Sequence, residues 1–160
     1  MAIDRLVAPL LRVPLFAGLK PLQITELARQ AERVKFRRGD VIAKAGEPGD
    51  GAYLIVSGPA EHMEPSDAET ATGPIEAGSL IGEMAMLVEH EYRATVIALD
   101  RVLCLKFTRV AVRAQMLEDA ALARHFERRI CERLSRVVDD LRQIDSILAA
   151  CGSDAAQPAA

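Results

Sequence analysis

The stretch IGEMAMLVEHEYRATV, residues 81–96, carries more information about fold and function than any other part of the chain. Gly82 permits a tight turn at the end of a short apolar strand, because glycine adopts left-handed backbone angles at little cost. We expect residues 83–85 to begin a short helix, whose free N–H groups and dipole form an anion site. Arg93, on the strand that follows, can complete a phosphate clamp. Glu83 can accept hydrogen bonds from a sugar hydroxyl.

Short strands are predicted on both sides of this stretch, over residues 34–107. They are apolar segments, rich in Val, Ile, Leu and Thr, and turns containing glycine or proline separate them. The expected strands cover residues 34–37, 41–44, 52–56, 93–98 and 102–107. Strands this short at such regular spacing favour an antiparallel barrel or sandwich over a parallel sheet. Residues 65–73 are small and polar, and we expect them to form a hairpin loop.

Helical patterns flank the strands. Apolar residues recur at steps of three and four between residues 10 and 34, with Pro21 placed to start a helix. After the strands, Thr108 is expected to cap a short helix over residues 109–117. Asp119 is expected to cap a longer helix that reaches about Leu148.

The long C-terminal helix carries an apolar seam at alternating steps of four and three, which is a heptad pattern. Its members are Ile130, Leu134, Val137, Leu141, Ile144 and Leu148. One interpretation is that the seam packs on the chain's own barrel. The seam extends past what one small barrel could cover, so we expect a homodimer through residues Ile130, Leu134, Val137, Leu141 and Ile144. Asp140 and Asp145 would repel across a parallel pair, which argues against a tight zipper along the whole helix.

Composition excludes several classes of protein. The 160 residues include 20 Lys and Arg against 23 Asp and Glu, a net charge of −3 that does not favour DNA binding by this chain alone. No apolar run approaches the roughly 20 residues that span a bilayer, and no signal peptide is recognisable. The three cysteines, Cys104, Cys131 and Cys151, are odd in number and far apart. They indicate reduced thiols and a cytoplasmic protein.

Catalysis is not expected either. No spacing of histidine, cysteine or acidic residues suits a metal ion, and no nucleophile lies in a recognisable pairing with a base. We therefore predict a protein that is not an enzyme and has neither a metal nor a cofactor.

Residues 81–96 resemble the phosphate-binding cassette of cyclic nucleotide-binding domains. These domains occur in the catabolite activator protein, protein kinase A regulatory subunits and cyclic nucleotide-gated channels. FRRGDVIAKAGEPGDGAYLIVSG, residues 36–58, is similar to the family's second to fourth strands, and IEAGSLIGEMAML, residues 75–87, to the approach to the cassette. The resemblance covers about residues 15–141. It implies a mostly β, α+β fold: a small antiparallel β-barrel of the double-stranded β-helix or jelly-roll type, with N-terminal helices and a long C-terminal helix.

On this resemblance the chain divides into a cyclic nucleotide-binding-like domain, 1–148, and a disordered tail, 149–160. The domain comprises an N-terminal helical part at 10–33, the β-barrel at 34–107 and C-terminal helices at 108–148.

The resemblance also implies a ligand, cAMP or cGMP, inside the barrel. Backbone amides near Met84 and Ala85 would meet the cyclic phosphate, Glu83 would bind the ribose 2′-hydroxyl, and Arg93 would neutralise the phosphate. The implied ligand-binding residues are Gly82, Glu83, Met84, Ala85, Arg93, Ala94 and Thr95. Because Ala94, and not Thr or Ser, follows Arg93, cAMP is favoured over cGMP.

The cassette departs from the family pattern where the phosphate-binding arginine is expected. The family's cassette ends in Pro-Arg-x-Ala-Thr-Val, whereas residues 91–96 read Glu-Tyr-Arg-Ala-Thr-Val. An ungapped alignment puts Tyr92 at the arginine position and Arg93 one residue later. In a strand, a shift of one residue turns the side chain to the opposite face.

Two interpretations remain open. A bulge or a longer loop between residues 88 and 91 restores Arg93 to the phosphate. Alternatively the pocket has lost its arginine, and Tyr92 donates its hydroxyl to a phosphate or fills the cavity. The loss of a charge-assisted contact would weaken binding by about 1.5–3 kcal/mol.

The leading hypothesis is a cyclic nucleotide-sensing regulatory module that acts in signal transduction by moving its C-terminal helix and signals through an unknown effector protein. The alternative is a degenerate domain that binds no nucleotide and serves as a dimerisation or protein-interaction unit. A transcription factor of the catabolite-activator type needs a helix-turn-helix domain of about 60 residues after the long helix. Only a dozen residues follow Leu148, so we do not expect that function unless the chain is a fragment.

Overall fold

The computed structural model of the chain describes residues 2–63 and 73–154. These residues belong to two compact units, Met1–Ala123 and Arg124–Ala160. The first unit holds all the β-strands that the structure describes and the first three α-helices, and the second is helical where it is described.

Most strands of the first unit belong to two antiparallel four-stranded sheets. The first sheet contains, in spatial order, β1 (Glu32–Phe36), β10 (Val102–Thr108), β4 (Gly51–Ser57) and β7 (Leu80–Ile81). The second contains β2 (Val41–Ala43), β9 (Thr95–Ala98), β5 (Ala60–Met63) and β6 (Gly73–Ile75). A two-stranded ribbon pairs β3 (Pro48–Gly49) with β8 (His90–Glu91). The expected mostly β fold with flanking helices is confirmed, while a fully closed barrel stays a prediction.

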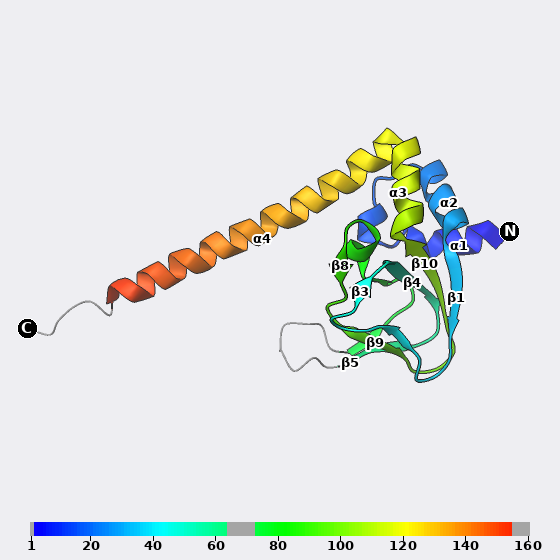
Figure 1. The fold of residues 1–160 in the computed structure, drawn as a ribbon, viewed down its shortest axis with the longest axis horizontal. Coiled ribbons are helices and arrows are strands. Elements are labelled where there is room, and N and C mark those ends of the chain that lie inside the picture. Colours follow the sequence, from blue (N-terminus) through cyan, green and yellow to red (C-terminus); the bar gives the residue numbers. More distant parts are fainter. Residues whose placement is uncertain (1, 64–72, 155–160) are drawn as a thin grey trace, which may run out of the picture. The chain divides into compact units, whose positions relative to one another are not determined.

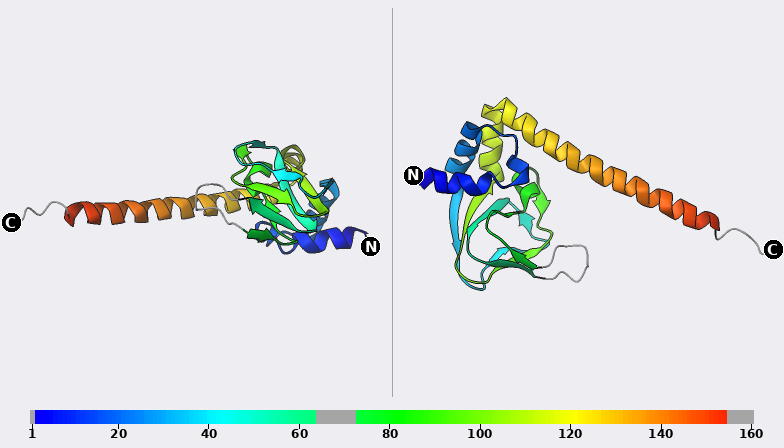
Figure 2. Two further views of the ribbon diagram at one scale, coloured as in Figure 1. Left: turned by 90° about the horizontal axis from the view of Figure 1, so that it is seen from below. Right: turned by 180° about the vertical axis from the view of Figure 1, so that it is seen from behind.

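An apolar cluster lies between the two sheets. Figures 1 and 2 show the strands curving around this common interior. Both sheets contribute buried residues to it: Ile42, Ala43, Ile55, Ala60, Ile75, Ile81, Val96, Ala98, Val102 and Cys104. Three partly buried aromatic residues, Phe36, Tyr53 and Tyr92, pack against the same cluster. The interior that the fold would offer to a ligand is therefore lined on one side by aromatic rings.

Strand β10 is buried on both faces, which explains its continuous apolar run. Val102 and Cys104 belong to the cluster between the sheets. Phe107 packs instead on Phe16, with ring centroids 5.8 Å apart. Helices α1 (Ala2–Leu10), α2 (Pro21–Gln30) and α3 (Arg109–Glu118) contact the sheet that holds β4 and β10.

The helix caps behave as the sequence predicts. Thr108 Oγ1 accepts a hydrogen bond from Ala111 N, and Asp119 Oδ1 accepts from Ala121 N and Leu122 N. These bonds satisfy N–H groups that the first turn of a helix leaves without a partner.

The N-terminal helical part differs from the expected range 10–33. Helix α1 precedes it and ends at Leu10, and a short 3-10 turn, η1 (Pro14–Phe16), separates α1 from α2. At the other end Glu32 already belongs to β1, paired with Lys106. Strand pairing therefore ends the helical pattern earlier than the apolar spacing alone suggests.

Helix α4 (Ala120–Asp154) supplies the described part of the second unit. It continues past Leu148, so the expected tail at 149–160 begins inside the helix, and residues 155–160 lie outside the described ranges. The seam side chains Leu134, Val137, Leu141, Ile144 and Leu148 are 50–62% exposed.

In the ranges that the structure describes, no helix is long and apolar enough to cross a membrane. Of the expected hairpin loop, 65–73, residues 65–72 also lie outside these ranges, and Gly73 begins β6.

Candidate functional site

The turn at Gly82 has the geometry that the sequence predicts. Gly82 is left-handed, with φ 70° and ψ 38°, and a 3-10 helix, η2 (Glu83–Met86), follows directly. Ala85 N donates to Gly82 O at 3.0 Å, and Val88 N donates to Met84 O at 2.9 Å. The first turn of η2 is therefore fixed by backbone bonds. We call residues 82–87 the cassette turn.

The side chains of the cassette turn divide into two groups. Ala85, Met86 and Leu87 are buried. Glu83 and Met84 are only partly buried. The carboxylate of Glu83 stands in the first turn of η2, where a negative charge is favourable.

Gly82 is required for a second reason besides its φ angle. A β-carbon at this position would lie 2.5 Å from Cε1 of Tyr92. At Gly49, a β-carbon would lie 2.5 Å from the Cβ of Ala85 and 3.0 Å from Cζ of Tyr92. The ring of Tyr92 therefore fills the space between the cassette turn and strand β3.

Tyr92 is the residue that faces the interior. Its ring packs against the apolar cluster, and its hydroxyl donates to Gly51 O at 2.8 Å. Burial, together with the neighbouring Tyr53 and Asp50, raises the pKa of Tyr92 to about 12. The phenol is therefore neutral at physiological pH and acts as a hydrogen-bond donor.

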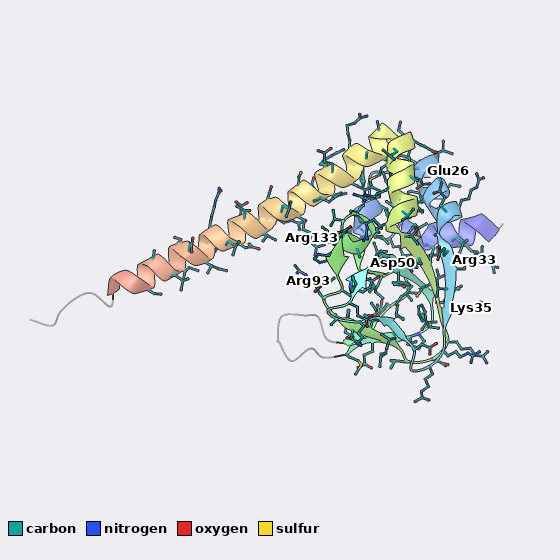
Figure 3. All side chains as sticks on the ribbon, in the orientation of Figure 1. Glu26, Arg33, Lys35, Asp50, Arg93 and Arg133 are labelled. Carbon is teal, nitrogen blue, oxygen red and sulfur yellow. The ribbon has the colours of Figure 1, made fainter. Side chains whose placement is uncertain are left out.

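Arg93, by contrast, is exposed, and Figure 3 shows it at the margin of the β-sheets. The register is fixed on both sides of it. Tyr92 N donates to Glu47 O, Gly46 N donates to Tyr92 O, and Thr95 Oγ1 accepts from Ala45 N. Of the two sequence interpretations, the structure has the one that places Tyr92 inside and Arg93 outside. Ala94 and Thr95 are partly buried.

A cation does face the interior near the cassette turn, but it comes from β10. Lys106 Nζ pairs with Asp50 Oδ2 at 2.7 Å and lies 5.5 Å from the ring centroid of Tyr53. The Lys106 side chain is only 16% exposed, whereas that of Asp50 is 66% exposed. Burial by itself lowers the pKa of Lys106, yet the contacts with Asp50 and Tyr53 outweigh it and raise that pKa.

Arg109 joins the cassette turn to the start of α3. Its Nη1 donates to Gly49 O at 2.8 Å, Ala85 O at 3.0 Å and Val88 O at 3.3 Å. Its backbone N donates to Asp50 O at 2.7 Å. One side chain thus ties together β3, η2 and α3.

Sequence reasoning did not identify Tyr53, Lys106 or Arg109 as part of this site. The sequence did contain a sign of Lys106, since it is the single charged residue in the apolar run 102–107. Nothing in the sequence distinguishes Arg109, because an arginine at the start of a helix is ordinary. Because the sequence has few aromatic residues, it also did not indicate that Tyr53 and Tyr92 pack close together in the interior.

The sequence also matches known proteins. The model of the cyclic nucleotide-binding domain matches residues 33–119, more than half of the chain. A cAMP-dependent protein kinase regulatory subunit from Emericella nidulans is 37% identical over 98 residues, which cover 61% of this chain and 23% of the relative. A CRP-like cAMP-activated global transcriptional regulator from Mycobacterium tuberculosis is 25% identical over 137 residues, covering 84% of this chain and 61% of the relative.

Two solved structures are similar as well. A cyclic nucleotide-binding-like protein from Brucella abortus matches with a TM-score of 0.63 and 29% identity, over 72% of this chain and 100% of that one. The N-terminal domain of a transcriptional regulator from Streptomyces coelicolor A3(2) matches with a TM-score of 0.72 and 27% identity, over 86% of this chain and 95% of that one. Against the kinase regulatory subunits, the match spans only about a quarter of their length or less. The family match, the antiparallel sheets and the glycine turn before η2 together show that this chain belongs to the cyclic nucleotide-binding domain family.

Proposed function

We propose that this chain is a regulatory module that senses a cyclic nucleotide, with cAMP favoured over cGMP, and is not an enzyme. The observation that carries the proposal is the left-handed Gly82 followed by η2, inside the segment that matches the family. The kinase regulatory subunits and the mycobacterial regulator among its relatives are named for cAMP. Their names support cAMP as the first ligand to test.

In this proposal the cassette turn holds the cyclic phosphate through backbone N–H groups. The N-terminus of η2 presents these groups to an anion. Ala85 N already bonds Gly82 O, so a phosphate oxygen would share or replace that bond. Glu83 would accept from the ribose 2′-hydroxyl, and Ala94 and Thr95 would border the ligand.

Regulation would pass from the cassette turn to the C-terminal helix. Arg109, the first residue of α3, supports this route, since it donates to Ala85 O in the cassette turn and to Val88 O just after it. We propose that a ligand shifts an equilibrium between two positions of that helix. The signal would go to an effector protein in the cytoplasm rather than directly to DNA.

A homodimer through α4 is part of the same proposal. Exposed apolar side chains recur along the helix at heptad spacing, including Leu134, Val137, Leu141 and Ile144. Sedimentation equilibrium should show a dimer that Leu141→Asp weakens and Ser146→Asp, a polar site on the same helix, leaves intact. A monomeric wild-type chain would refute this part.

A second function is favoured by a specific observation. Tyr92 packs against Gly82 and Gly49 and donates to Gly51 O, so its ring takes up space beside the cassette turn. A domain whose phosphate position is filled in this way would bind no nucleotide and would serve as a dimerisation or protein-interaction unit.

Thermal unfolding in the presence of nucleotides separates the two functions. We expect millimolar cAMP to raise the Tm more than cGMP does, and linear AMP to have little effect, because a ligand of the folded state stabilises it. If neither cyclic nucleotide changes the Tm, the degenerate domain is the better description.

A further inference from the structure

We propose that Lys106, and not Arg93, supplies the cation that binds an anionic group at the cassette turn. The inference rests on the proposed function, because the anion it describes is the cyclic phosphate. The positive charge would then come from β10, whereas the family's cassette carries its arginine on the strand segment that follows the cassette turn.

The position of Lys106 in β10 supports this role. Lys106 alternates with Cys104, which belongs to the cluster between the sheets, whereas Leu105 and Phe107 are buried on the other face. The side chain is 16% exposed, and its ammonium lies over the ring of Tyr53. A cation held in the interior is screened less by water and salt than an exposed one.

Lys106 acts electrostatically on Tyr92, whose ring packs against Gly82 of the cassette turn. Asp50 lies between Gly49 and Gly51, and both glycines touch that turn. A β-carbon at Gly49 would meet Ala85, and Gly51 O accepts the hydroxyl of Tyr92, which lies against Gly82. Asp50, the partner of Lys106, is therefore adjacent in sequence to two residues that border the cassette turn.

Asp50 can give way to an incoming anion. Its carboxylate is 66% exposed, so it can turn into water and keep its charge solvated. The ammonium would then exchange one anionic partner for another. Tyr92 assists, because its neutral hydroxyl can donate to the same anion instead of to Gly51 O. Arg93 cannot reach this side without a change in the strand register that Tyr92 and Thr95 fix.

The test measures cAMP affinity by isothermal titration calorimetry in four single variants of the full chain and in the double variant Lys106→Met, Asp50→Asn. Lys106→Met removes the cation and keeps most of the stem, and Lys106→Arg restores a cation. Arg93→Met is the matched control, since it changes the net charge equally. Asp50→Asn removes the competing carboxylate.

We expect Lys106→Met to weaken cAMP binding at least tenfold and Lys106→Arg to recover most of the loss. Arg93→Met should change the affinity less than twofold. Asp50→Asn should tighten binding several-fold in the wild type and have no effect in the Lys106→Met background, because the two groups are coupled. Circular dichroism on each variant checks that it is folded.

A second titration separates this inference from the proposed function. Inorganic phosphate is added to the wild type while the ¹⁵Nζ resonance of Lys106 is followed, with Lys106→Arg used to assign the signal. If cAMP fails to bind but millimolar phosphate shifts the Nζ signal, the sensor function is wrong and the anion site stands. The role of Lys106 is refuted if cAMP binds Lys106→Met as tightly as the wild type, or if Arg93→Met causes the larger loss of affinity. It is also refuted if cAMP does not bind the wild type and phosphate does not shift its Nζ signal.

Discussion

The cassette turn, residues 82–87, and the strand segment that follows, residues 91–94, form one continuous sequence motif, yet they are specified in different ways. The turn depends on the backbone: a left-handed glycine, a 3-10 helix and hydrogen bonds between main-chain atoms. The strand segment depends on which side chain faces inward, and here that side chain is Tyr92.

This difference explains how one half of a motif can keep its geometry while the other half changes. Backbone donors tolerate many side chains, because only Gly82 is restricted by its angles and its neighbours. A cationic side chain in a strand must occupy one particular position, since a shift of one residue in the strand places it on the solvent face. We therefore expect substitutions in the turn to affect stability most and substitutions at the exposed strand position to affect it least.

Gly82→Ala should be the most damaging change. It adds strain at a positive φ and a β-carbon 2.5 Å from the ring of Tyr92, so the free energy of unfolding should fall by about 3 kcal/mol. Gly46→Ala is the matched control, because Gly46 has φ 81° with nothing within 4 Å of the added carbon, and it should cost about 1 kcal/mol. Urea unfolding measures both, and equal losses would show that the ring does not restrict Gly82.

Arg109→Met tests whether side-chain bonds also hold the turn. The variant leaves the carbonyls of Gly49, Ala85 and Val88 without the guanidinium, which should lower the free energy of unfolding by about 2 kcal/mol. Arg113→Met on the exposed face of α3 should change it by less than about 0.5 kcal/mol. A similar result for the two variants would mean that Arg109 contributes nothing specific.

Tyr92→Phe tests the strand segment. The loss of the bond from the hydroxyl to Gly51 O should lower the free energy of unfolding by about 1 kcal/mol at neutral pH.

The same variant should change the response to alkaline pH. The folded chain holds the Tyr92 proton up to a pKa of about 12, whereas the unfolded chain releases it near 10. The stability that this raised pKa contributes is complete below pH 10 and is lost as pH rises through 12. The gap in stability between the wild type and Tyr92→Phe should therefore narrow over that range, and a gap that widens would contradict the placement of the phenol.

Arg93→Met should have the smallest effect on stability. Arg93 is exposed, so the free energy of unfolding should change by less than about 0.5 kcal/mol in urea unfolding. A loss above about 1 kcal/mol, the usual size for a substitution that removes a real contact, would show that the guanidinium has a role the exposed position does not reveal.

The sequence predicted the backbone-defined part of this molecule better than the side-chain-defined part. Strands β1, β2, β4, β9 and β10, the Thr108 and Asp119 caps and the turn at Gly82 were found, because glycine placement and apolar spacing report directly on local geometry. The short strands β3, β5, β6 and β8 were not predicted. Helix α1 and the early start of β1 were missed, since they depend on packing and pairing with distant strands.

The direction of Tyr92 is an instructive intermediate case. Its position next to Arg93 could be read from the sequence, but two registers fitted equally well until the bonds to Glu47 O and Gly46 N were known. Lys106 and Asp50 are 56 residues apart, so no local pattern could pair them.

The central claim is that the cassette turn binds a cyclic nucleotide even though Arg93 faces solvent. Isothermal titration calorimetry of the wild-type chain with cAMP tests it most directly. We expect saturable heat with one nucleotide bound per chain. The absence of any heat at millimolar cAMP, with the protein shown to be folded, would contradict it.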